Sequence, residues 1–317
     1  MSVPDISILL AKVETTPGTY AAPVVGADAV TVFNYEITPV EGENFRRSID
    51  LPFAGARPSQ RTAVRARHAF SVELSGGGTA TGVPVWAKLL RASLFGAPVV
   101  GADSVSIPLI NTGDGDALSI SGWKANARHR AAMVRGNAVL EFVEKALPSL
   151  RLDLLGLIEG AAPADANTAG TPTYDAYPAP VEVNASNTAI LLDGFELGCR
   201  SFTLDMGMKT EFYSTTGGRA IIFGKSEDGD RRSPGGTIVA ELPDPSVKEY
   251  FTALLANTPL AFSLVHGLTA GNIIEIESAK LVLEDISYTV EANRLFMNAT
   301  FKFVADAANN DFTLVTK

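Results

Sequence analysis

Two stretches of this chain share one pattern, a β-strand ending in Glu-Leu that leads to an amphipathic helix. The first strand is predicted at residues 69–74 and its helix at 84–95, where apolar residues recur at helical spacing. The second strand is predicted at 237–242 and its helix at 245–258. Further strands are expected after each helix, so the sequence predicts two related β-rich units in tandem. No catalytic motif recurs with the pattern, which favours assembly over catalysis.

The chain has 317 residues, which is enough for two domains with hydrophobic cores. Its net charge of −9 lies wholly in the second half. Residues 1–160 carry 15 basic and 15 acidic side chains, whereas residues 161–317 carry 11 and 20. Because an acidic surface repels phosphate, the second half is not expected to bind nucleic acid. No apolar run is long enough for a signal peptide or a bilayer span, so we expect a protein that stays in aqueous surroundings.

The expected organisation is a first β domain at residues 1–160, a linker at 161–180 and an acidic second β domain at 181–317. Proline and glycine exclude a long helix from residues 1–29, which are expected to form an extended N-terminal arm. Residues 43–67 are expected to project as a long loop or hairpin, since connections of this length are usually functional or mobile.

Side chains that could support catalysis are scarce. His68, His129 and His266 have no partner at metal-ligand spacing, and arginines flank His129 on both sides. Cys199 has no nearby histidine and is expected to be a buried small apolar residue rather than a nucleophile. We therefore expect no catalytic residue, no metal site and no cofactor.

Three short motifs resemble ligand loops but lack the residues that would complete them. Asp114-Gly115-Asp116 and Asp228-Gly229-Asp230 lack the remaining ligands of a calcium loop, and Asp-Gly is a common turn pair. Gly76-Gly77-Gly78 precedes the first predicted helix, but no Lys-Ser/Thr follows as in a phosphate-binding loop. All three are interpreted as turns.

The segment at residues 43–67 is rich in arginine and has no lysine. Its arginines are Arg46, Arg47, Arg57, Arg61, Arg65 and Arg67. They could form a solvated face, bind nucleic acid or dock on a carboxylate-rich protein surface. The third interpretation is favoured because guanidinium pairs with carboxylates in a bidentate manner and is enriched at interfaces. Arg46, Arg47, Arg57, Arg61 and Arg65 are the candidate contact residues, and the acidic second half of a neighbouring copy is the candidate partner.

The N-terminal half carries several stretches that together suggest a family. They are residues 12–19 (Lys-Val-Glu-Thr-Thr-Pro-Gly-Thr), 27–30, 39–43, the loop through Gly55, and 70–78 leading to 84–92. Over about the first 95 residues the chain resembles the major tail proteins, or tail tube proteins, of long-tailed, siphovirus-type bacteriophages. The remainder is similar only in its order of strands and helix.

The resemblance implies a mainly β fold with a few short helices, built here as two tandem sandwich or barrel units that each carry one flanking helix. Such units form rings that stack into a hollow tube, through which DNA passes and which holds the tape-measure protein. Family members usually form rings of six single-domain subunits. Two units per chain imply homotrimeric, pseudo-hexameric rings, whereas a second half that serves as a decoration domain implies hexameric rings. Tail terminator and distal tail proteins are the other implied partners, and the implied location is the virion tail after assembly in the host cytoplasm.

Two alternatives remain at this point. The chain could be another phage ring component, such as a tail terminator or a capsid decoration protein, although these are usually shorter. It could also be a phage-associated hydrolase or carbohydrate-binding module. That function would need clustered carboxylates or exposed aromatic side chains in a cleft.

Overall fold

Strands dominate the computed structural model, which describes residues 7–317 except 51, 53–54, 125–126, 161–164, 167–170, 175–177, 226–228 and 292. Helical structure in these residues is limited to short elements. They are α1 (Ala87–Leu90), the 3-10 turn η1 (Arg91–Ser93) that continues it, and α2 (Phe251–Ala256). The mainly β fold class expected from the sequence is confirmed.

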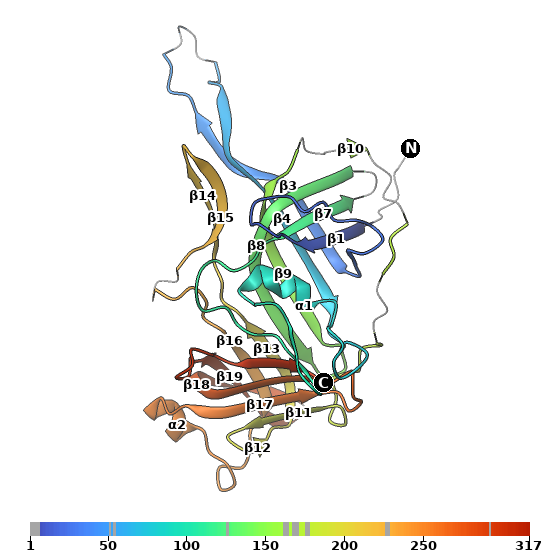
Figure 1. The fold of residues 1–317 in the computed structure, drawn as a ribbon. Coiled ribbons are helices and arrows are strands. Elements are labelled where there is room, and N and C mark those ends of the chain that lie inside the picture. Colours follow the sequence, from blue (N-terminus) through green and yellow to red (C-terminus); the bar gives the residue numbers. More distant parts are fainter. Residues whose placement is uncertain are drawn as a thin grey trace.

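The first half of the chain forms an antiparallel sheet, the upper part of Figure 1. The strands of this half are β1 (Ser7–Val13), β2 (Ala29–Val30), β3 (Phe33–Arg46), β4 (Ser59–Glu73), β5 (Val99–Val100), β6 (Val105–Ser106), β7 (Leu118–Lys124), β8 (Ala127–Val143), β9 (Ser149–Ile158) and β10 (Asp165–Ala166). Of these, β5 pairs with β6, and β6 pairs with the last strand of the chain, β20 (Thr313–Thr316), in the second half. The main strands pair in the order β1-β7-β8-β9-β4-β3. Helix α1 follows β4, so strand and helix come in the order that the sequence indicates.

The second half forms the lower part of Figure 1. Its strands are β11 (Thr188–Leu192), β12 (Phe195–Glu196), β13 (Cys199–Asp205), β14 (Thr210–Thr215), β15 (Gly218–Phe223), β16 (Gly235–Glu241), β17 (Leu260–His266), β18 (Ile274–Glu291), β19 (Arg294–Phe303) and β20 (Thr313–Thr316). The main strands pair in the order β11-β17-β18-β19-β16-β13. The two strand orders correspond. If the six main strands of each half are numbered along the chain, both sheets have the spatial order 1-4-5-6-3-2. Helix α2 follows β16 as α1 follows β4.

The two halves share one sheet and one core, joined by the short β6–β20 pairing and more extensively at β8. This long strand pairs with β7 along its first part, and its residues 139–143 pair with β13. The ring centroids of Phe142 and Phe202 lie 6.3 Å apart across this junction, and Phe202 stacks on Phe262 at 5.0 Å. All three side chains are buried in one hydrophobic cluster, and burying each such ring stabilises the fold by roughly 1.5–3 kcal/mol.

Residues 7–13 do not form a free arm. They form β1, which pairs with β2 and along its full length with β7. Leu9, Leu10 and Ala11 are all buried, although consecutive side chains point to opposite faces. A strand that is covered on both faces has a continuous run of apolar residues in its sequence. Here the nearby proline and glycine residues favoured the prediction of an arm instead of a strand.

Both helices are shorter than expected. Leu94 adopts a left-handed conformation that ends the first helical segment. In the second, the Asp244 side chain accepts hydrogen bonds from Ser246, which holds a turn where helix was expected. Val247 and Leu255 are 68% and 84% exposed, so they do not belong to the apolar face that helical spacing suggested.

Candidate assembly surfaces

The arginine-rich segment lies at the outer end of the β3–β4 hairpin, which extends beyond the rest of the first half (Figure 1). Arg46 ends β3, Arg47 and Arg57 lie in the connection, and Arg61 and Arg65 lie on β4. The side chains of Arg46, Arg47 and Arg57 are exposed and form no ion pair within the described part of the chain. Their positive charge is therefore available to another surface.

Arg61 and Arg65 have weak partners inside the hairpin. Nε of Arg65 lies 3.4 Å from a carboxylate oxygen of Glu41, and Nη1 of Arg61 donates to the carbonyl of Val40 at 3.4 Å. Ion pairs in contact with solvent contribute only about 0–1 kcal/mol, so a better placed carboxylate could replace these contacts. The structure thus gathers the five candidate arginines on one hairpin.

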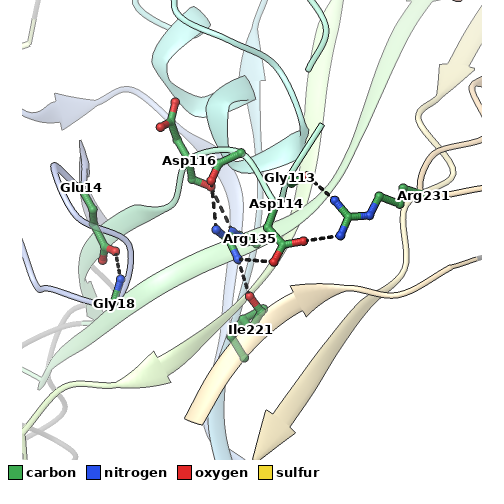
Figure 2. Close-up of polar contacts among 9 residues, drawn as sticks. Glu14, Gly18, Gly113, Asp114, Asp116, Arg135, Ile221 and Arg231 are labelled. Carbon is green, nitrogen blue, oxygen red and sulfur yellow. Dashed lines mark hydrogen bonds and ion pairs between the residues drawn. The ribbon is translucent and has the colours of Figure 1, made fainter. Parts of the chain in front are cut away.

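A second hairpin, β14–β15, extends on the same side of the molecule (Figure 1). In the sequence it lies between β13 and β16, which pair with each other. It is fixed at its base by Arg135 of β8, whose side chain is almost fully buried. The guanidinium donates to the carbonyls of Gly115 at 3.0 Å and Asp116 at 3.1 Å, and to Ile221 of β15 at 2.7 Å (Figure 2). One side chain of the first half therefore holds a projecting element of the second half.

The carboxylates at residues 114 and 116 are engaged by arginines. Asp114 lies 2.8 Å from Nη2 of Arg231 and 3.8 Å from Arg135 (Figure 2), and Asp116 lies 2.6 Å from Arg91. Burial lowers the pKa of Arg135, and the nearby carboxylates oppose this effect. No group of three His, Cys, Asp or Glu side chains in the described chain is placed to hold a metal ion. Of the second Asp-Gly-Asp motif, Asp228 lies outside the described residues.

A buried carboxylate fixes the connection after β1. Glu14 is 3% exposed and accepts hydrogen bonds from the backbone N–H of Gly18 at 2.6 Å (Figure 2) and Met133 at 2.7 Å, and from the hydroxyl of Ser119 at 2.8 Å. Sequence reasoning missed both Glu14 and Arg135. The signal in the sequence was a charged residue shortly after a run of apolar residues, residues 8–11 before Glu14 and residues 131–134 before Arg135.

The three histidines are buried, whereas Cys199, which was expected to be buried, is only partly so. Burial lowers the pKa of His68 to about 3, and its Nδ1 lies 2.9 Å from the hydroxyl of Tyr35. Burial also lowers the pKa of His129 and His266 and raises the pKa of the Cys199 thiol to about 12. A thiol with such a pKa is a poor nucleophile at neutral pH.

The glycine run before α1 lies where the two halves meet. The N–H of Gly78 donates to the carbonyl of Gly271 at 2.9 Å, and the N–H of Gly76 donates to the Asn272 side chain at 2.8 Å. A Cβ at Gly76 would lie 2.1 Å from the carbonyl oxygen of Gly271. These glycines therefore allow close backbone contact between the halves.

The outer edge of β3 and the last part of one edge of β18 have no strand partner in the described part of the chain. β3 pairs along one edge with β4 and along its other edge with no strand. β18 pairs with β17 as far as Leu281, and beyond this point its residues 283–291 pair only with β19. Tyr288 and Val290 on this part are 51% and 67% exposed. Unpaired strand edges with apolar side chains favour pairing with another chain.

A model of the phage tail tube protein family matches residues 5–308. The chain belongs to the phage tail tube protein family. The match spans both halves, so it extends well beyond the region in which the resemblance was recognised. No curated protein matches the sequence. This tail tube protein is a structural subunit that assembles with itself into the tube of a phage tail, and it is a component of the virion tail.

The tail tube protein thus has a structural rather than an enzymatic family assignment. Its projecting hairpins and open strand edges suit a self-assembling subunit; the β3–β4 hairpin was expected from the sequence at residues 43–67, whereas the β14–β15 hairpin and the open edges were not. In the described residues, no helix is both long and apolar enough to span a membrane.

Proposed function

We propose that three copies of this chain form one ring of the tail tube and that each chain fills two of six equivalent positions. The observation that supports this proposal is the common strand order, β1-β7-β8-β9-β4-β3 and β11-β17-β18-β19-β16-β13. In this proposal residues 1–160 and 181–317 are the two units and 161–180 link them. Six chains per ring would be needed if the second half were a decoration domain. A shared strand order argues against that alternative.

In this tube, DNA passes through the lumen without specific binding and the tape-measure protein occupies it before ejection. The net charge of −9 supports such a role, because each Lys or Arg contact with a phosphate releases counterions and adds affinity that would slow passage. Tail terminator and distal tail proteins close the two ends. Assembly takes place in the host cytoplasm, and the subunit needs no cofactor and catalyses no reaction.

The β3–β4 hairpin supplies the contact between subunits or rings in this proposal. Arg46, Arg47 and Arg57 are exposed cations, and the second half carries 20 acidic against 11 basic residues. A guanidinium that binds a carboxylate across an interface forms two parallel hydrogen bonds, which fix orientation as well as add energy. Arg61 and Arg65 join the contact by giving up their weak partners within the hairpin, the Val40 carbonyl and Glu41, for carboxylates of the neighbouring subunit.

Negative-stain electron microscopy of the concentrated protein tests the ring. Hollow tubes whose end-on views classify with three-fold symmetry are expected, because the two halves differ in sequence even where their strands correspond. Six-fold end-on views would contradict two units per chain. Compact monomers at every concentration, both without and with preformed tail ends as initiators, would contradict assembly of this chain into a tube.

Replacing Arg46, Arg47, Arg57, Arg61 and Arg65 together by Glu tests the hairpin. Repulsion between like charges should abolish tubes, while the circular dichroism spectrum and the thermal midpoint of the monomer stay close to those of the parent. A matched variant with Lys at the same five positions keeps the charge but loses the bidentate geometry, so it should form fewer tubes than the parent and more than the Glu variant. Normal tubes from the Glu variant would exclude this role.

A further inference from the structure

The junction between the two halves of one chain shows how two units of this fold can join. Residues 139–143 of β8 pair antiparallel with β13, and Leu140 lies opposite Leu204. Phe142 lies opposite Phe202 in the same ladder. All four side chains are at most 1% exposed. The junction is therefore both a hydrogen-bonded ladder and a dry apolar contact.

The corresponding positions in the second half follow from the strand ladders, starting from the two Glu-Leu strand ends. Glu73 pairs with Ser149, which pairs with Glu141. In the second half, the counterpart of Glu73 is Glu241, which pairs with Phe296 and then Thr289. Thr289 thus corresponds to Glu141, and by the same count Tyr288 corresponds to Leu140 and Val290 to Phe142. Side chains that are sealed at the internal junction are replaced at this position by ones that are 51% and 67% exposed.

The other side of the junction has a counterpart as well. His68 pairs with Ile37, whereas its second-half equivalent Gly236 pairs with Leu204. Ile37 of β3 therefore corresponds to Leu204 of β13. β13 has β8 along its outer edge, but the outer edge of β3 is open in the described part of the chain. Each chain thus has one open edge of each kind.

We propose that β3 of one chain pairs antiparallel with residues 283–291 of β18 in the next chain, with Ile37 opposite Tyr288 and Thr38 opposite Ser287. This contact rests on the ring proposed above, and it repeats between chains the ladder that β13 and β8 form within one chain. It joins two different surfaces, so it propagates head to tail and closes only as a ring. Pairing of both open edges also removes the exposed ladders that would otherwise aggregate.

Charge on the two edges supports the same partner. In its own chain, the β14–β15 hairpin next to β13 lies against β8 and β9. A β3 strand seated on β18 would place the β3–β4 hairpin over the corresponding strands of the neighbour, β18 and β19. There Glu284 and Asp285 are exposed and form no ion pair within the described residues. The arginines of the hairpin thus meet carboxylates on the surface that the strand pairing selects.

Disulfide trapping tests the proposed register in the full chain. Residues that face each other in antiparallel strands have Cα atoms about 4.5–5.5 Å apart, which a disulfide can span. In a Cys199→Ser background, Ile37→Cys with Tyr288→Cys should give an interchain disulfide under mild oxidation. The products should form a ladder on a non-reducing gel that ends at three chains. Thr38→Cys with Ser287→Cys uses two exposed positions of the same register and should give the same ladder.

A one-residue shift provides the control. Ile37→Cys with Thr289→Cys places the second thiol on the opposite face of β18, so this variant should cross-link much less. The proposed ladder would be overturned if all three cysteine pairs cross-linked equally, or if neither of the two in-register pairs cross-linked. Electron micrographs of the same samples separate the two proposals. Rings that form without interchain disulfides would support the three-chain ring but exclude the pairing of β3 with β18. Samples with neither rings nor disulfides would exclude both the ring and this strand pairing.

Discussion

At the residue scale, Arg135 is a buried cation whose hydrogen bonds reach from the first half of the chain to the second. Its three carbonyl acceptors come from Gly115, Asp116 and Ile221. Arg135→Met should therefore lower the free energy of unfolding by roughly 3 kcal/mol, because it leaves buried acceptors without donors. Urea denaturation measures this change. Arg151→Met removes an ion pair whose arginine is 59% exposed and should cost less than about 1 kcal/mol. Equal losses in the two variants would contradict this role.

His68 gives the fold a specific dependence on pH. Its pKa is lowered by burial to about 3 in the folded chain, from an ordinary value of 6.5. The unfolded chain therefore binds a proton below about pH 6.5 that the folded chain does not bind until about pH 3. The stability that depends on a neutral His68 imidazole is present above pH 6.5. It is lost as the pH falls, by at most about 1.4 kcal/mol of unfolding free energy per pH unit.

The matched variant for this effect is His68→Gln, which cannot titrate. Unfolding free energies measured between pH 7 and pH 5 should fall less steeply in the variant than in the parent. Parallel pH profiles would show that His68 is protonated equally in both states. His129 and His266 remain in both proteins, so the difference between the profiles reports on His68 together with its electrostatic coupling to His129.

Single side chains were predicted unevenly from the sequence. The arginine-rich segment was recognised because six arginines without a lysine are conspicuous in the sequence, whatever secondary structure the segment adopts. Arg135 and Glu14 were missed because their partners lie far along the chain or on backbone atoms, as Ile221 does relative to Arg135. Such partners become visible only when the strand order is known.

At the element scale, the glycine run before α1 is a packing device between the halves. Gly76→Ala should lower the free energy of unfolding by about 1–3 kcal/mol, because a Cβ would lie 2.1 Å from the carbonyl oxygen of Gly271. Thermal or urea denaturation measures the loss. A Cβ at Gly26 would meet no atom within 4 Å, so Gly26→Ala is the control and should change stability little. Unchanged stability of the Gly76 variant would show that the backbones separate easily.

Elements were predicted well in kind and less well in extent. The strands predicted at 69–74 and 237–242 are present as the end of β4, which begins earlier at Ser59, and as β16. The helices were overestimated because apolar residues at helical spacing also suit the turns around Asp244 and Leu94. The open edges of β3 and β18 could not be predicted, since an edge is defined by the strand that is missing beside it.

At the scale of the whole molecule, assembly through arginine and carboxylate should depend on salt. Raising the ionic strength from about 0.1 to 1 M shortens the Debye length from about 10 Å to about 3 Å. The concentration needed for tube formation should therefore rise, as measured by pelleting and electron microscopy. The thermal midpoint of the monomer should change little over the same range, because its core is apolar. A salt-independent threshold for tubes would argue that strand pairing alone holds the subunits.

The continuity of β8 through both halves has a mechanical consequence for a three-chain ring. Around such a ring, seams inside a chain would alternate with seams between chains, and only the former have a covalent connection. Hoop tension from DNA under pressure would then concentrate at three compliant joints rather than spread over six. A tube of this kind should widen, bend and finally rupture along those joints, with each chain staying whole as a stiff arc.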